Sequence, residues 1–108
     1  MAFSVSAGGS GSERVLQVSG ELDIASAGEL RSAGEAALND SACTALRLDL
    51  AEVSFMDSTG LGVLIGLRNS AEAGRKDLVI ANPSPTVSRL LDLSGLLGVF
   101  RVEPTAAV

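Results

Sequence analysis

The 108-residue sequence contains no histidine, tyrosine or tryptophan. A chain without histidine lacks the usual general base near neutral pH and the commonest side-chain ligand of transition metals. Ser-His-Asp and Cys-His nucleophilic sites are excluded for the same reason. Carboxylates and Lys76 remain as catalytic groups, but no two acids are placed as an acid–base pair. We therefore expect neither an enzyme nor a metal or cofactor site.

Cysteine is scarce as well, because Cys43 stands alone. A single cysteine forms no internal disulfide, which is typical of a reducing compartment. We interpret Cys43 as a small hydrophobic residue at a loop-to-strand junction, with redox sensing as the alternative. The amino terminus lacks a signal-peptide pattern, and the longest apolar run, residues 61–67, is far shorter than the roughly 20 residues of a membrane span. These features predict a cytoplasmic protein.

Basic clusters are missing from a chain whose net charge is −5. Gathered Lys and Arg side chains bind nucleic acids and anionic membranes, so we expect neither partner, and a basic or neutral protein surface fits better. Aromatic residues make up only 3% of the chain, although apolar residues make up 46%. The core must therefore consist of Leu, Val, Ile and Ala, and the length suits one modest domain.

The periodicity of apolar residues predicts strands that alternate with helices after an initial hairpin. This order favours an α/β fold, with a mixed sheet of four to five strands covered by about three to four helices. We expect one domain over residues 1–108, with residues 104–108 as a flexible tail. The predicted strands cover residues 3–7, 15–19, 45–50, 78–81 and 99–102, and the predicted helices begin near Ser26, Ser58 and Ser84.

Local signals predict how these elements begin and end. Ser26 and Glu29 have the spacing of a capping box at the start of the first helix. The Gly-Gly-Ser-Gly-Ser segment at residues 8–12 is typical of a flexible turn. Gly74 is placed to end the second helix as its C′ residue, and Gly95 to end the third, which Ser84 can cap.

The most informative segment is residues 56–62, Met-Asp-Ser-Thr-Gly-Leu-Gly, where an extended segment turns into a helix. Asp57 or Ser58 can cap this helix, whose free N–H groups and positive dipole end lie at the same place. A hydroxyl here would be exposed, and a phosphate on it would meet a field that favours negative charge. The alternative is a plain N-cap without regulation.

The start of this helix is unusually apolar, because residues 60–67 include no polar side chain. A helix that lies on one face of a sheet normally has a polar outer side. Either other elements cover these turns as core, or part of them forms an exposed apolar patch. Such a patch suits a protein partner, and it is equally compatible with a homodimer.

These motifs resemble the STAS domain family, and within it the bacterial anti-sigma factor antagonists. Residues 20–23, Gly-Glu-Leu-Asp, are similar to the family's motif after its second strand. Residues 55–63, Phe-Met-Asp-Ser-Thr-Gly-Leu-Gly-Val, resemble its signature segment, and residues 84–96 resemble its third helix. The resemblance covers nearly the whole chain and implies the STAS fold.

The resemblance also implies a partner switch. In this family the unphosphorylated antagonist binds an anti-sigma factor that is also a serine kinase, and binding releases a sigma factor. Phosphorylation of the serine after the motif aspartate, which is Ser58 here, switches binding off, and a PP2C-type phosphatase reverses it. Thr59 is a less favoured acceptor. The implied partner-binding residues are Asp23, Asp57, Ser58, Thr59, Gly60 and Leu61.

Two other functions remain open at this point. The chain could be a STAS subunit of a transporter or lipid-trafficking complex, in which Ser58 or Thr59 serves contact only. It could also be a small nucleotide-binding sensor, but no Gly-rich phosphate loop with a lysine is present, so this function ranks last.

Overall fold

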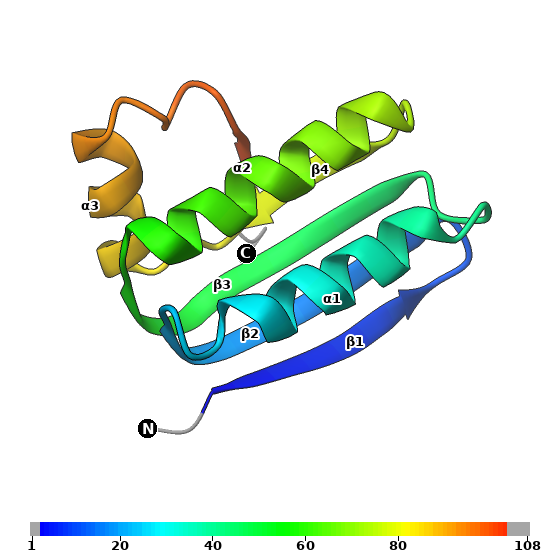
Figure 1. Ribbon diagram of the computed structural model, residues 1–108. Helices are drawn as coiled ribbons and strands as arrows, with labels where there is room; N and C mark the ends of the chain where they lie inside the picture. Colours follow the sequence, from blue (N-terminus) through cyan, green and yellow to red (C-terminus); the bar gives the residue numbers. More distant parts are fainter. Residues whose placement is uncertain (1–2, 104–108) are drawn as a thin grey trace, which may run out of the picture.

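The computed structural model describes residues 3–103, which form a five-stranded mixed sheet and three helices (Figure 1). β1 pairs antiparallel with β2, and the pairs β2–β3, β3–β4 and β4–β5 are parallel. The predicted α/β fold with a mixed sheet is confirmed, whereas the predicted tail at 104–108 lies outside the described residues. In chain order the elements are β1 (Ser4–Ser10), β2 (Glu13–Leu22), α1 (Ala27–Asn39), β3 (Ala45–Met56), α2 (Ser58–Ala73), β4 (Asp77–Ala81), α3 (Pro85–Leu93) and β5 (Arg101–Glu103).

The first hairpin is longer than the sequence predicts. The ladder between β1 and β2 continues through Gly8↔Val15 to Ser10↔Glu13, so only Gly11 and Ser12 form the turn. The prediction of a flexible turn over residues 8–12 is therefore wrong for its first three residues. Strand pairing with β2 outweighs the low intrinsic strand preference of glycine.

Helices α1 and α2 lie side by side across one face of the sheet (Figure 1). Lys76, just after α2, donates from Nζ to the carbonyl oxygens of Leu38 and Asp40 at the end of α1. This places a cation where the α1 carbonyls lack helical partners. α2 ends at Ala73, next to Gly74 as predicted, but Gly74 is the C-cap rather than the C′ residue, and the left-handed residue is Arg75, with φ of 58°.

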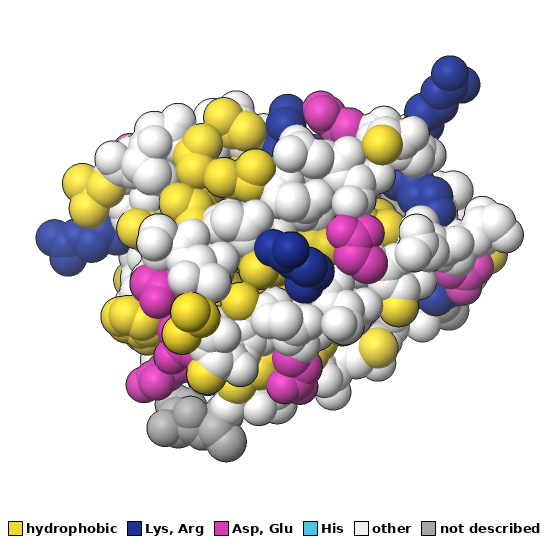
Figure 2. Space-filling model, in the orientation of Figure 1, with side chains coloured by type: hydrophobic (Ala, Val, Ile, Leu, Met, Phe, Trp, Pro, Cys, Tyr) yellow, Lys and Arg dark blue, Asp and Glu magenta, His cyan; other side chains and the backbone are white. Residues whose placement is uncertain are grey.

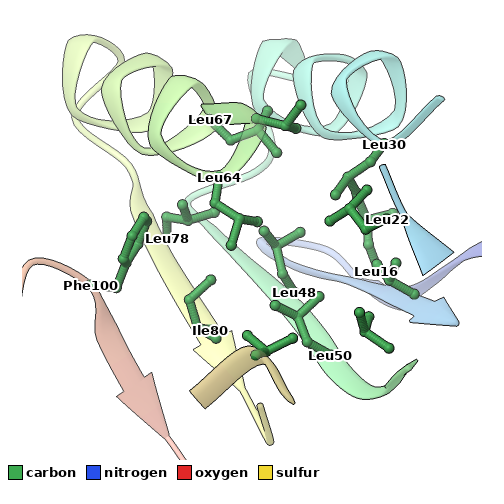
Figure 3. Packing of buried hydrophobic residues seen from close by; sticks show 14 of the residues in the cluster. Leu16, Leu22, Leu30, Leu48, Leu50, Leu64, Leu67, Leu78, Ile80 and Phe100 are labelled. Atoms are coloured by element: carbon green, nitrogen blue, oxygen red, sulfur yellow. The ribbon is translucent and has the colours of Figure 1, made fainter. Parts of the chain in front are cut away.

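Leucine fills the space between the helices and the sheet. Figure 3 shows Leu48 and Ile80 pointing up from the strands toward Leu64 and Leu67 on α2. Strand β4 is buried on both faces, because its last four residues are all buried. Cys43 is also buried, in agreement with its interpretation as a small hydrophobic residue. No helix within residues 3–103 combines the length and apolar character needed to cross a membrane.

Helix α3 packs against the far half of β3, where the Ser84 hydroxyl donates to Val53 O at 2.7 Å. The same hydroxyl accepts from Val87 N, so the predicted cap is confirmed. Gly95 follows α3 with φ of 75°, also as predicted. The last strand begins at Arg101 rather than at residue 99, because Val99 N donates to Leu96 O at 3.0 Å and residues 97–99 therefore form a turn.

β5 is held to the sheet by an ion pair that should respond to acid. Glu103 accepts from Arg47 at 2.7 Å and from Arg101 at 3.0 Å. The hydrogen bond from Arg47 is the main reason why the pKa of Glu103 lies below its ordinary value of 4.5. A carboxyl whose pKa is lower in the folded state stabilises the fold above its unfolded pKa, and this contribution is lost as pH falls through the folded pKa.

We therefore expect Glu103→Gln to lower the melting temperature at pH 7, and the difference from wild type to shrink as pH falls toward 3. Thermal unfolding followed by circular dichroism at a series of pH values measures this difference. Glu29→Gln is the control, because Glu29 is exposed on α1 and makes no ion pair within residues 3–103. A deficit in Glu103→Gln that is the same at every pH would contradict the assignment.

Candidate functional site

The candidate site lies where β2 and β3 end side by side. Leu22 and Met56 are the last register pair of these parallel strands. Asp57 N donates to Leu22 O at 3.4 Å, which ties the start of α2 to the loop that follows β2. The two segments singled out in the sequence, residues 20–23 and 56–62, therefore meet at one end of the sheet.

Asp57 rather than Ser58 caps α2. Its side-chain Oδ1 accepts from Thr59 N at 2.9 Å and from Gly60 N at 3.2 Å. Its carbonyl oxygen accepts from Leu61 N at 3.0 Å. The carboxylate thus satisfies two of the free N–H groups at the helix start and stands at the positive end of the helix dipole.

Ser58 is the hydroxyl that this cap presents to solvent. The residue is exposed, and its side chain makes no hydrogen bond with any residue in the range 3–103. The neighbouring Thr59 is half-buried. A kinase or a binding partner can therefore reach the Ser58 hydroxyl without breaking a hydrogen bond within residues 3–103, whereas Thr59 is partly covered by neighbouring residues.

The loop after β2 is held by hydrogen bonds of its own. Asp23 Oδ1 accepts from Ala25 N at 3.0 Å, and Asp23 O accepts from Ala27 N at 2.8 Å. The predicted capping box is wrong: Ser26 Oγ makes no cap hydrogen bond and instead donates to Glu21 O at 2.7 Å. Asp23 thus has a structural use in the turn, and it is half-buried beside Asp57.

Gly60 does not present a docking surface, contrary to the sequence expectation, because it is buried. A Cβ at this position would lie 2.8 Å from Leu22 Cγ, 2.8 Å from Met56 Cγ and 2.9 Å from Leu22 O. The missing side chain is what lets α2 approach the end of β2. Gly60 therefore sets the position of Ser58.

The apolar start of α2 is mostly core. Val63, Leu64 and Leu67 are buried, while Leu61 and Ile65 pack against the core from half-buried positions. Both interpretations of the sequence are therefore partly right. Half-buried Leu61, three residues after Ser58, is the part of this apolar run that stays partly accessible next to the candidate site.

Two apolar residues near Ser58 were missed by the sequence reasoning. Ile24 is 82% exposed in the loop after β2, and Phe55 is 45% exposed two residues before Asp57. Neither follows a strand or helix periodicity that would have marked it as exposed. Two register shifts between β2 and β3 interrupt the alternation of buried and exposed side chains along β3. The pattern of the neighbouring residues therefore does not predict that the Phe55 side chain is exposed.

A shallow groove of about 380 Å³ continues from this end of β3 to α3. It is lined by Phe55, Met56, Pro85, Thr86, Arg89, Leu90 and Leu93. Figure 2 shows hydrophobic side chains gathered on the same side of the molecule, over α3 and the segment that follows it. Phe55 and Leu93 thus contribute exposed apolar area to the groove next to the candidate site.

The segments that meet at this end of the sheet are acidic. Glu21, Asp23 and Asp57 lie in the two segments that meet there, and Arg89 lines the neighbouring groove. Among residues 3–103 no group of three or more histidine, cysteine, aspartate or glutamate side chains is arranged to hold a metal ion. The site therefore presents the exposed Ser58 hydroxyl close to acidic and apolar side chains.

Comparisons with known proteins agree with this geometry. The chain is 33% identical over 90 residues to the anti-sigma F factor antagonist of Paenibacillus polymyxa, which covers 83% of this chain and 74% of that protein. The fold matches the anti-sigma factor antagonist SpoIIAA in its unphosphorylated form, with a TM-score of 0.79 and 30% identity over 97% of this chain and 90% of that one. The phosphorylated form of the Bacillus protein SpoIIAA matches with a TM-score of 0.74 and 30% identity, over 97% and 93% of the two chains.

The sequence profile of the STAS domain matches nearly the whole chain, from residue 5 to residue 107. That span includes both segments that meet at the candidate site and all three helices. The chain therefore belongs to the STAS domain family.

Proposed function

We propose that this protein is an anti-sigma factor antagonist that binds an anti-sigma factor with serine kinase activity, and that phosphorylation of Ser58 switches the binding off. The observation that supports it best is the exposed Ser58 hydroxyl, which heads a helix already capped by Asp57. Relatives that carry the antagonist name, and SpoIIAA structures in both phosphorylation states, support the same function.

The cap makes Ser58 sensitive to added charge. A phosphoryl group carries about −1.5 to −2 charges at neutral pH. Because the Asp57 carboxylate already accepts from Thr59 N and Gly60 N, those donors are not free to neutralise the phosphate. The dianion would stand beside a carboxylate at the surface, so a partner pressed against it must desolvate it or supply cations.

The docking surface combines polar and apolar contacts. Asp23 and Asp57 present carboxylates to a basic partner surface, while Leu61 and the exposed Ile24 supply apolar contact area. Thr59 lies beside Ser58 and contributes contact from its half-buried position. Gly60 acts from beneath by holding α2 against Leu22.

The protein in this proposal is a ligand and a kinase substrate, and it catalyses nothing itself. A PP2C-type phosphatase removes the phosphate, and the exchange takes place in the cytoplasm without direct contact with nucleic acid or membrane. A STAS subunit of a transporter or lipid-trafficking complex is the second candidate. It is less favoured, because the relatives reported above are named as antagonists.

The kinase reaction tests the proposal directly. We expect a cognate anti-sigma kinase with ATP to add about 80 Da, one phosphoryl group, to the wild-type chain and nothing to Ser58→Ala. Intact-mass spectrometry measures the gain, and Thr59→Ala is the matched control that should still gain the mass. Modification of Ser58→Ala to the wild-type extent would overturn Ser58 as the acceptor.

A further inference from the structure

β1 forms an outer edge of the sheet that the protein leaves unprotected. Every second residue of an outer strand points its N–H and C=O groups away from the sheet, where another strand can pair with them. Natural proteins usually block such edges with charges, proline or short strands. β1 is seven residues long, reads Ser-Val-Ser-Ala-Gly-Gly-Ser, and contains neither a charged residue nor a proline.

The opposite edge of the sheet is different. β5 has only three residues, and two of them, Arg101 and Glu103, are charged and joined by an ion pair of 3.0 Å. This edge has the usual protections of short length and charge. The two edges therefore differ in whether they admit a further strand, and only β1 is open to one within residues 3–103.

The side chains of β1 that face the helices change in size along the strand. Val5 near its start, and Phe3 just before the strand, pack against the core. Ala7 and Gly9, further along the same face, are exposed and leave space. A hollow of about 600 Å³ lies at that second half. It is lined by small residues of β1 and the turn, by Arg14, Val15 and Leu16 of β2, and by Ala33, Ala36 and Ala37 of α1.

We propose that a second copy of this chain pairs with β1 through its own β1, antiparallel and around a two-fold axis at Ser6. In this register Ser4 of each copy lies opposite Gly8 of the other, and Val5 lies opposite Ala7, whereas Gly9, with φ of 81°, ends the regular extended stretch of the edge. The larger side chains of one strand thus stand beside the small residues of the other, next to the hollow. An antiparallel strand with large residues at one end and small ones at the other is complementary to itself.

Charge and geometry are compatible with this dimer. Each copy carries a net charge of −5, but residues 3–12 contain no charged side chain, so no like charges face each other across the paired strands. Ser4 pairs with Ser19, near the end of the sheet that carries Ser58. Antiparallel pairing therefore directs the two Ser58 sites toward opposite ends of the joined sheet, where both stay accessible to partners.

The interface consists mainly of one strand pair, which is below the standard size of stable interfaces, so we expect weak, concentration-dependent association. Sedimentation equilibrium over about two decades of concentration should show the mass rising from 10.9 kDa toward twice that value. Ser6→Lys places two cations opposite each other at the axis, and it should weaken dimerisation at least about tenfold. Asn69→Lys, exposed on α2, is the matched control and should dimerise like wild type.

A cross-link gives a second, independent measurement. Side chains directly opposite on paired strands have Cβ atoms about 5 Å apart, close enough for a disulfide after a small shift. Ser6→Cys should therefore form a covalent dimer under mild oxidation, and Ser32→Cys, exposed on α1, should not. A wild-type mass of 10.9 kDa at every concentration, or equal association of Ser6→Lys and wild type, would overturn the proposal.

Discussion

Ser58→Asp is expected to weaken binding to the cognate anti-sigma factor about 100-fold, while Ser58→Ala should stay within about threefold of wild type. A loss of 100-fold corresponds to about 2.7 kcal/mol. The cause is charge at an exposed position, since the Asp57 carboxylate next to it already occupies Thr59 N and Gly60 N. Alanine removes the hydroxyl without adding charge, and the exposed side chain of Ser58 makes no hydrogen bond within residues 3–103 that its loss would break.

Isothermal titration calorimetry with the purified anti-sigma factor measures both affinities. Asn69→Asp is the control for charge alone, because it adds one negative charge to an exposed position of α2 well away from the helix start. We expect this variant to bind like wild type. Equal affinities for Ser58→Asp and Ser58→Ala would show that charge at residue 58 does not control docking.

Gly60→Ala is expected to destabilise the fold by about 2 kcal/mol, although alanine is the better helix former. The added methyl group would lie 2.9 Å from Leu22 O and 2.8 Å from the Cγ atoms of Leu22 and Met56. Leu22 O cannot withdraw freely, because it accepts from Asp57 N. Relief would require α2 to move away from β2, which also shifts the cap that presents Ser58.

We expect the opposite effect on stability when Gly62, on the same helix, is replaced by alanine. A Cβ at Gly62 meets nothing within 4 Å, so Gly62→Ala should stabilise the fold by roughly 0.5–1 kcal/mol through helix propensity. Urea unfolding of the two variants measures both free energies. Gly60→Ala and Gly62→Ala are the same substitution in the same helix. The difference between their free energies of unfolding therefore measures the effect of the close packing of α2 on Leu22. A Gly60→Ala variant as stable as Gly62→Ala would contradict the tight packing on Leu22.

Two sequence-based predictions about helix ends were wrong because another segment of the chain makes a competing contact. Ser26 and Glu29 have capping-box spacing, but the Ser26 hydroxyl is committed to Glu21 O. Gly74 suits a helix end, yet the left-handed residue is Arg75, beside the Lys76 that binds the end of α1. The interaction of Ser26 with Glu21 and that of Lys76 with α1 both involve residues outside the helix concerned. The spacing of residues within one helix therefore does not predict them.

The position of Ser58 at the helix start could be predicted from the sequence, whereas the residues around it could not. Asp57, Ser58 and the apolar run after them are adjacent in the chain, and the cap forms from hydrogen bonds over three residues. The exposure of Ile24 and Phe55 depends on how β2 and β3 end together and on the register shifts between them. The apolar alternation along β3 breaks after Leu50, but that break alone does not show which of the following side chains face outward.

The sequence by itself determined the class of the fold, the order of its elements and the position of the hydroxyl, because each rests on short-range periodicity and on capping groups next to one another. Only the tertiary structure decided that Gly60 is buried against Leu22 and Met56 rather than exposed next to Ser58. It also decided that β1 extends to Ser10 as an outer edge of the sheet. Both depend on which distant strand a segment lies against. That choice is made by packing and strand pairing over the whole sheet.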